Sequence, residues 1–400
     1  MRDNVSEAVS LIQQGHKAFF KFIAANETGD TGGHQCGFYI PRDYLSEAFE
    51  SPCVKGENQD KQVKILWNGE ILTNSRFIYY GKGTRNEARI TTFGRGFEFL
   101  KPEYTGALVV FVKETTNLFH SFVFNSEEEI DGFLGSLGLS PTDANKLIQA
   151  EAKSPTDQEK QAFSKFIAAL SGEFPSSVEM SAAARKIEGL VYDHAEYIQT
   201  NPDKKLLNWS DVEYRLFRAV EGHRYGGAVG KGFATVDDFL KLANTLLNSR
   251  KSRAGKSFEH HLSALFAGNG LQFAEQVVTE ENKKPDFIFP SAEAYHDASF
   301  DDDRLVFLAA KTTCKDRWRQ ILNEADRFKG KTKYLCTLQQ GMTVKQVNEM
   351  TAEKVVLVVP KPYIPAYPAD KQEGILTIAD FIRKVKCVQA GQRRLGQDAL

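Results

Sequence analysis

The sequence predicts a two-domain protein in which an all-β barrel is followed by an α/β domain with a mixed central sheet. The chain has 400 residues, enough for two domains that each bury a core. Residues 37–124 hold short strand-like runs of bulky apolar residues separated by polar loops, which is typical of a small β barrel. Further along, strand-like and helical patterns alternate, which is typical of an α/β domain.

The composition is that of a soluble globular protein. No apolar run approaches the length of a membrane span, and the N-terminus lacks the apolar core of a signal peptide. The five cysteines include no CxxC pair, which argues against structural zinc and against a disulfide framework. We therefore expect a cytoplasmic protein without membrane contact. The net charge of −1 does not itself suggest nucleic-acid binding, so the local distribution of basic residues decides that question.

The expected barrel has two polar loops that can contact another molecule. Its strands are expected at 63–67, 76–80, 106–112 and 119–124, after a helix, or a helix leading into a strand, within residues 6–23. The loop at 26–35 is rich in glycine, and the loop at 81–96 alternates arginines with amides and an acid, which suits contacts to phosphates and base edges. Solvated surface loops are the alternative interpretation. The candidate contact residues are Asn26, His34, Gln35, Lys82, Arg85, Asn86, Glu87, Arg89 and Arg95.

The second half of the chain predicts the α/β domain. Helices are expected at 181–197, at 212–220, from the basic cluster at 250–256 onward and at 380–385, with strands at 333–338 and 354–359. The stretch at 141–161 is polar and suits a linker or an exposed helix. We therefore expect domains at 1–150 and 174–400 joined by a linker at 151–173. The glycine–lysine segments at 227–232 and 255–257 lack the spacing of a nucleotide-binding loop.

The stretch from Pro285 to Glu324 carries a set of residues suited to phosphodiester hydrolysis. Asp286 begins one apolar run, Lys311 ends the next, and Glu324 lies on an expected helix beyond it. Two carboxylates can hold Mg²⁺, while a lysine can orient the attacking water or stabilise the pentavalent phosphorus centre. Solvated charges at strand ends are the common alternative.

The amino-acid sequence of the same stretch resembles that of the EcoRII-type restriction endonucleases. The resemblance lies in residues 282–292, 294–297 and 311–326, in 251–257 upstream, and in the loop segments 27–41 and 84–87. It implies a type II enzyme, of type IIE, that cuts double-stranded DNA. It also implies a B3-like N-terminal pseudobarrel whose two loops embrace effector DNA, and a C-terminal PD-(D/E)xK-type fold. Ala309 stands where the usual motif has its second acid, so Glu324 takes that role.

The resemblance further implies the roles of individual residues. Asp286 and Glu324 are expected to hold Mg²⁺, and Lys311 is expected to act on the water and the phosphate. Two further residues, Glu259 as a supporting carboxylate and Tyr295 with a weakly determined role, complete the expected catalytic set.

Base recognition is implied for residues that follow the catalytic lysine. Lys315, Asp316 and Arg317 are expected to read C·G pairs of a CCWGG-type site cut before the first cytosine, and Tyr214 is a candidate stacking surface for a flipped central base. The neighbouring Asp211 departs from the family pattern and leaves the central base pair open. In the barrel, Ala88 and an additional glycine between Lys82 and Arg85 likewise leave the individual effector contacts open.

The expected partners are target and effector copies of double-stranded DNA, a second copy of the chain in a homodimer, and a cognate DNA methyltransferase. Effector DNA is expected to activate the enzyme allosterically by displacing the N-terminal domain from the catalytic cleft. A catalytically inactive DNA-binding regulator is the alternative, but it predicts a broken Asp–Lys–Glu set, and this set is whole. A methyltransferase would need a glycine-rich cofactor loop and a Pro-Cys pair, which the sequence does not supply.

Overall fold

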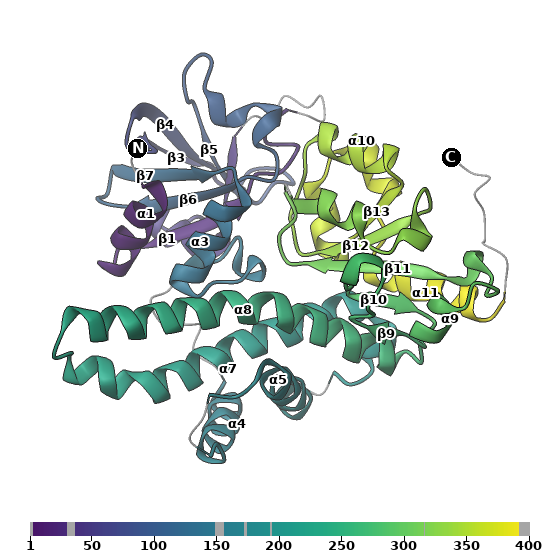
Figure 1. The fold of residues 1–400 in the computed structure, drawn as a ribbon. Coiled ribbons are helices and arrows are strands. Elements are labelled where there is room, and N and C mark those ends of the chain that lie inside the picture. Colours follow the sequence, from purple (N-terminus) through teal and green to yellow (C-terminus); the bar gives the residue numbers. More distant parts are fainter. Residues whose placement is uncertain are drawn as a thin grey trace. The chain divides into compact units, whose positions relative to one another are not determined.

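The computed structural model describes residues 3–29, 37–148, 156–171, 174–192, 194–315 and 317–391. The chain divides into two compact units (Figure 1). The first comprises Met1–Lys153 with two later segments, Gln339–Val347 and Tyr363–Gln372, and the second comprises the remainder of the chain. Among the described residues, no helix has the length and apolar character needed to cross a membrane.

The first unit is built on one eight-stranded sheet with the order β2-β5-β4-β3-β7-β6-β1-β8. All neighbouring pairs among the first seven of these strands are antiparallel except β3 and β7, which are parallel. The strands predicted in the barrel are confirmed. The strands are β1 (Ala18–Phe22), β2 (Phe38–Ile40), β3 (Gln59–Trp67), β4 (Ile71–Tyr80), β5 (Glu87–Thr91), β6 (Leu108–Lys113), β7 (Leu118–Phe124) and β8 (Leu147–Ile148), and the helices are α1 (Asn4–Gln13), α2 (Leu45–Ala48) and α3 (Glu127–Leu137).

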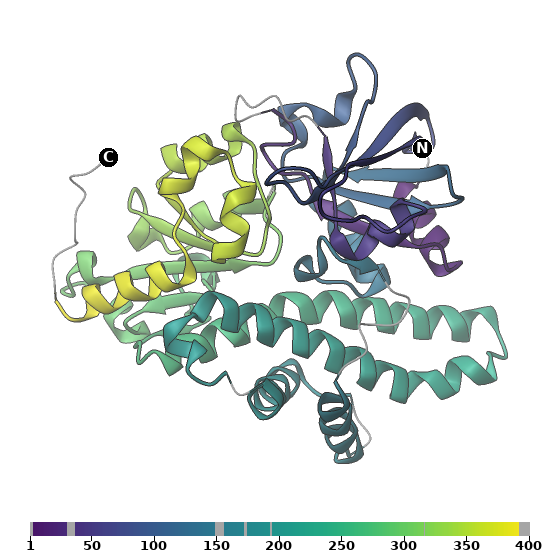
Figure 2. The same cartoon turned by 180° about the vertical axis from the view of Figure 1, so that it is seen from behind.

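Apolar residues fill both faces of this sheet because its central strands are buried on both sides. Along β6, Val109 and Phe111 join an aromatic core around Trp67, while Val110 and Val112 point to the opposite core. Helices α1 and α3 pack together over that opposite face (Figure 1 and Figure 2). The near-continuous apolar run of β6 is therefore the sequence pattern of a strand that is buried on both faces.

The two later segments complete the first unit. The N–H of Ala25 donates to the carbonyl of Ala366 at 3.0 Å, and the Gln339 amide donates to the carbonyl of Gly106 at 3.0 Å. Gly106 has a φ of +81°, and a Cβ there would lie 2.4 Å from the Gly341 carbonyl oxygen, so only glycine fits. The expected domain at 1–150 thus includes residues from far along the chain.

The second unit has a five-stranded mixed sheet with the order β13-β12-β11-β10-β9. β11, β12 and β13 are parallel, whereas β9, β10 and β11 pair antiparallel. The α/β domain with a mixed sheet is confirmed. The strands are β9 (Ala274–Glu275), β10 (Phe287–Phe289), β11 (Val306–Lys311), β12 (Lys333–Thr337) and β13 (Val355–Val358).

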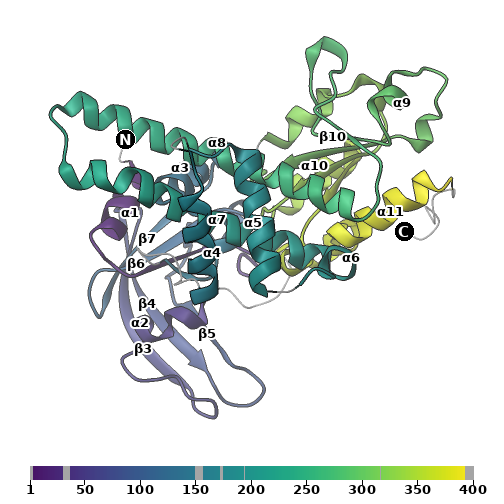
Figure 3. The same cartoon turned by 90° about the horizontal axis from the view of Figure 1, so that it is seen from below.

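Helices form a separate layer of the second unit. α7 and α8 make a long antiparallel hairpin, and α4 and α5 lie against α7 (Figure 3). The helices are α4 (Asp157–Ala168), α5 (Ser177–Tyr192), α6 (Tyr197–Thr200), α7 (Pro202–Lys231), α8 (Val236–Gly268), α9 (Ala292–His296) and α11 (Ile378–Gln389). The residues of α10 (Val344–Ala352) are divided between the two units after Val347.

Three features of the second unit differ from the sequence prediction. The segment expected to be a linker contains α4, whose Phe163 is buried in the helical core and whose Glu159 pairs with Arg215 at 2.7 Å. The basic cluster at 250–256 lies in the middle of α8 and not at its start. The expected helix after Lys311 is a 3₁₀ segment, Arg317–Asn323, and Glu324 follows its end.

Candidate active site

The sheet brings Asp286 and Lys311 together because β10 and β11 are antiparallel neighbours. Asp286 directly precedes β10, and Lys311 is the last residue of β11. The Lys311 ammonium lies 3.7 Å from Oδ2 of Asp286. That oxygen also accepts a hydrogen bond of 2.8 Å from the backbone N–H of Ala310, which fixes the carboxylate beside the lysine.

Glu324 completes the predicted set from the end of the 3₁₀ segment. The charges of Lys311 and Asp286 both act on its carboxyl, so the three groups share one region. Burial raises the pKa of Glu324 above its usual value, and the negative charge of Asp286 adds to this, while Lys311 opposes it.

Lys333, which the sequence pattern did not single out, holds the segment that carries Glu324. This buried lysine begins β12 and donates to the carbonyls of Ile321 at 3.0 Å, Leu322 at 2.8 Å and Glu324. A 3₁₀ helix leaves its last carbonyls without partners, and the ammonium supplies three donors to them. Lys333 therefore positions the backbone of Glu324, and its positive charge also lowers the pKa of the Glu324 carboxyl.

Replacement of Lys333 by Met should reduce DNA cleavage by roughly 10²-fold, because loss of the ammonium releases the turn that places Glu324. The midpoint of thermal unfolding should also fall, since buried carbonyls lose their donor. Cleavage rates and thermal melts of Lys333→Met and of Lys331→Met, a more exposed lysine that pairs with Asp302, give the comparison. Equal cleavage by the two variants would contradict the positioning role.

Glu259 reaches the same region from α8. The neighbouring turns of this helix are fixed, because Phe258 and Leu262 are buried and His261 lies 2.8 Å from Glu213 of α7. Burial, together with the negative charge of Asp286, raises the pKa of Glu259 to about 7, although the positive charges of Lys256 and Lys311 oppose the rise. A carboxyl held this close to another acid favours a cation in its surroundings.

The cluster suits a hard divalent cation that keeps part of its water shell. Within the described part of the chain, no group of three or more His, Cys, Asp or Glu side chains is placed so that it could hold a metal ion. The negative charge of Asp286 nevertheless acts on both Glu259 and Glu324, and it contributes to the raised pKa of each glutamate. Mg²⁺ is commonly bound through one or two carboxylates together with substrate phosphates, while it keeps several of its waters.

Tyr295 lies on α9 and its hydroxyl donates to Glu280 at 2.7 Å. Its ring stacks on Phe328 at 6.2 Å between centroids, and its backbone carbonyl accepts from Arg327. These contacts anchor α9 against the turn that follows Glu324. The structure thus gives Tyr295 a packing role, and any further role stays a prediction.

The expected base-reading residues lie in the turn after β11. Lys315 is buried and Arg317 is exposed, while Asp316 lies outside the described residues. Arg317 is the first residue of the 3₁₀ segment that leads to Glu324. A base contact made by Arg317 would therefore come from a residue close in sequence to the catalytic residues. The exposed guanidinium is the member of this pair that is accessible to DNA.

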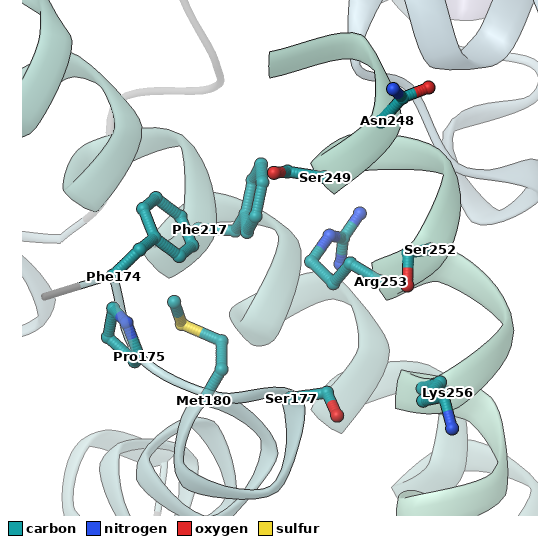
Figure 4. Close-up of a pocket in the computed structure, with 10 residues that line it drawn as sticks. All are labelled: Phe174, Pro175, Ser177, Met180, Phe217, Asn248, Ser249, Ser252, Arg253 and Lys256. Atoms are coloured by element: carbon teal, nitrogen blue, oxygen red, sulfur yellow. The ribbon is translucent and has the colours of Figure 1, made fainter. Parts of the chain in front are cut away.

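A pocket of about 580 Å³ lies between α5, α7 and α8 (Figure 4). Phe174, Met180 and Phe217 form an apolar wall, and Arg253 and Lys256 face them from α8. The remaining lining residues are Pro175, Ser177, Asn248, Ser249 and Ser252. Lys256 precedes Glu259 by three residues on α8, and its positive charge lowers the pKa of the Glu259 carboxyl.

Tyr214 is buried beside this pocket. The Arg253 guanidinium covers its ring at 5.4 Å and the Phe217 ring at 4.7 Å. A base could stack on Tyr214 only after Arg253 moved, so Tyr214 as a stacking surface stays a prediction.

The first unit presents its candidate contact residues along the β2–β5 edge. Tyr39 pairs with Arg89, and the loop at 81–86 joins β4 to β5. Lys82, Arg85 and Asn86 are exposed on that loop, where Arg85 lies over the Tyr80 ring at 5.3 Å. Arg95 is exposed in the turn after β5, and Arg89 pairs with Glu87 at 3.2 Å.

The start of the loop at 26–35 is held in place by contacts of the Glu27 carboxylate. Glu27 and Lys21 form a buried ion pair, and Glu27 also accepts from the N–H groups of Ala24 at 3.0 Å and Tyr39 at 2.9 Å. Asn26 is exposed in this turn, whereas His34 and Gln35 lie outside the described residues. The antiparallel pairing puts Phe38, at the start of β2, opposite Ile90, near the end of β5.

Two known protein families match the chain, one in each half of the sequence. Residues 13–145 match the family described as "Restriction endonuclease EcoRII, N-terminal", and residues 217–382 match "EcoRII C terminal". An acid–lysine pair on a mixed sheet, joined to a β barrel, is thus the arrangement of a type II restriction endonuclease, a site-specific deoxyribonuclease. The predicted fold class, a barrel followed by a restriction endonuclease fold, is confirmed.

The chain belongs to the EcoRII family. It is 36% identical over 401 residues to the type II restriction enzyme EcoRII of Escherichia coli, covering 93% of this chain and 94% of that protein. It is also 30% identical over 127 residues to the type II restriction enzyme SsoII of Shigella sonnei, covering 30% of this chain and 40% of that protein.

Solved restriction endonucleases resemble part of the chain more distantly. A metal-depleted Ecl18kI complex with uncleaved, modified DNA covers 61% of this chain and 87% of that chain, with 19% identity and a TM-score of 0.46. A PspGI–substrate DNA complex covers 55% and 94% respectively, with 16% identity and a TM-score of 0.47.

Proposed function

We propose that this enzyme cuts double-stranded DNA at short pseudopalindromic sites of the CCWGG type, with Mg²⁺ as its cofactor. The observation that carries the proposal is the Lys311 ammonium 3.7 Å from Asp286, on adjoining strand ends, with the carboxyls of Glu324 and Glu259 in the same electrostatic environment. This combination favours a role in phosphodiester hydrolysis over a role in stabilising the fold, because burial raises the pKa of two of its acids, Glu259 and Glu324.

Each residue then has a chemical task. Asp286 and Glu324 hold the ion, with Glu259 in support, and the Ala310 N–H keeps Asp286 oriented. Bound Mg²⁺ supplies an acidified water and shields the phosphate charge. Lys311 orients the attacking water and stabilises the charge that develops on the phosphoryl oxygens.

Recognition of the C·G pairs is assigned to Arg317, Lys315 and Asp316. A guanidinium can donate twice to guanine, and a carboxylate can accept from the cytosine amino group. Arg317 has the exposure that this task requires.

Replacement of Arg317 by Ala should remove about 1–3 kcal/mol of discrimination at the guanines. Competition binding between a cognate duplex and a C·G-substituted duplex measures this. Arg319→Ala is the matched control, because Arg319 lies two residues away and pairs with Glu349. An unchanged preference in Arg317→Ala would place Arg317 on phosphate or on the surface.

The first unit is proposed to bind a further copy of the site through the loops at 26–35 and 81–96. Its exposed Lys82, Arg85 and Arg95 suit a phosphate backbone. The chain holds one Asp–Lys–Glu set, and cutting two strands symmetrically calls for two chains, so we propose a homodimer. A cognate methyltransferase in the same cytoplasm would protect host DNA.

Digestion of a sequenced plasmid with Mg²⁺, followed by mapping of the ends, tests the proposal. Cuts before the first cytosine of CCWGG sites are expected. Specific binding without any cut would instead indicate a DNA-binding regulator, and cuts at other sequences would reject the assigned target.

A further inference from the structure

Gln276 joins two acids of the catalytic cluster through a single nitrogen. Its Nε2 lies 3.2 Å from Oε2 of Glu259 and 3.1 Å from Oδ1 of Asp286. Glu259 comes from α8 and Asp286 from the start of β10, so Gln276 bridges the helical layer and the sheet. An amide nitrogen carries two hydrogens, one for each carboxylate.

The amide has one favourable orientation in this environment. If the side chain were flipped, its carbonyl oxygen would face two carboxylates and repel both. With the nitrogen inward, each acid accepts a hydrogen bond from an uncharged donor.

The backbone of Gln276 is unusual for its residue type. Its φ is +49°, in the left-handed region that glycine and asparagine adopt most readily. Gln276 directly follows β9, and its N–H donates to the carbonyl of Asp286 at 3.2 Å. A turn needed only for its shape would favour glycine, so the glutamine side chain requires another reason.

We propose that Gln276 is a positioning residue that spans Glu259 and Asp286 and sets the affinity of the site for its divalent cation. The proposal rests on the metal-dependent function proposed above. The bridge holds both carboxylates toward the site before the ion arrives, so less ordering is needed on binding. Because the amide is neutral, it competes with the ion less than a lysine would.

The expected consequence is a change in cation dependence with little change in the chemical step. Without the bridge, Glu259 and Asp286 repel and separate, and the ion must bring them back. Loss of hydrogen bonds to charged groups should weaken cation binding about tenfold. The cleavage rate at saturating cation should stay within about threefold, since Lys311 and Glu324 are untouched.

The test uses the full chain and three variants. Gln276→Gly removes the amide and suits the left-handed backbone, while Gln276→Met removes the amide at similar length. Asn282→Gly is the matched control, because Asn282 is exposed, has a φ of +57° and lies in the adjoining turn. Mn²⁺ affinity is measured from the loss of the free-ion electron paramagnetic resonance signal, and Mg²⁺ dependence is measured from cleavage of a cognate duplex.

Both Gln276 variants should bind Mn²⁺ about tenfold more weakly and need correspondingly more Mg²⁺, while Asn282→Gly matches the parent protein. Mn²⁺ affinity of Gln276→Gly within twofold of the parent would overturn the proposal, even if Gln276→Met were impaired, because the role would then lie in the turn. Absence of Mn²⁺ binding by the parent would overturn it as well. A parent protein that binds Mn²⁺ but cuts no DNA would reject the proposed function alone.

Discussion

Lys311→Ala should lower the rate of DNA cleavage by at least about 10³-fold while leaving DNA binding in place. The Lys311 ammonium lies 3.7 Å from Asp286, and removing it takes away the group assigned to the water and to the phosphoryl charge. Single-turnover cleavage of a cognate duplex, together with binding of the same duplex without divalent cation, measures both effects.

The control for this variant is Lys284→Ala, which removes an exposed lysine two residues before Asp286. It should cut at the rate of the parent protein. Substantial cleavage by Lys311→Ala would remove Lys311 from the catalytic set. Equal loss of binding and of cleavage would instead make it a DNA-contact residue.

The acid–lysine pair was predictable because local sequence encodes it. Apolar runs specify β10 and β11, and their antiparallel pairing brings Asp286 to Lys311. The charges of Lys311 and Asp286 act on the Glu324 carboxyl, but the segment before Glu324, which was expected to be an α-helix, is a 3₁₀ segment. The spacing of Trp318, Ile321 and Leu322 is compatible with both helix types, so periodicity could not separate them.

The supporting contacts were not predictable because they join residues distant in sequence. Lys333 reaches carbonyls nine to twelve residues earlier, and Gln276 reaches Glu259 across seventeen residues. A buried lysine at a strand start and a glutamine in a turn carry no local pattern. The start of α8 was missed for another reason: Val236, Phe239 and Leu240 are exposed, so no buried stripe marks that end of the helix.

The second large effect is expected from relief of autoinhibition. In the mechanism that the family resemblance implies, the N-terminal domain covers the catalytic cleft in a closed state. Effector DNA would then activate cleavage only to the extent that it binds the open state more tightly than the closed state. The full chain should therefore cut a single-site plasmid slowly, and a short cognate duplex should accelerate it about 5–150-fold. A double variant, Arg85→Ala with Arg89→Ala, should lose this acceleration and keep the basal rate.

A protein that begins at Phe174 should cut the single-site plasmid without added duplex. Its stability should fall, because Gln339, Met342 and Tyr367 are buried within the first unit and would lose that environment. A full-length variant avoids this difficulty. Gly106→Ala places a Cβ 2.4 Å from the Gly341 carbonyl oxygen and strains a φ of +81°, so it should loosen the packing of 339–347 on the barrel.

Gly83→Ala is the matched control for this full-length variant, since Gly83 has a φ of +65° but open space around it. Gly106→Ala should raise the duplex-independent rate, and Gly83→Ala should leave it low. Cleavage of the single-site plasmid is compared for the parent, the truncated protein and both glycine variants, with and without duplex. Autoinhibition would be rejected if the parent protein cut the single-site plasmid at the same rate with and without duplex, and if the truncated protein cut it at that rate too. A first unit that inhibits the second must lose this effect when it is removed.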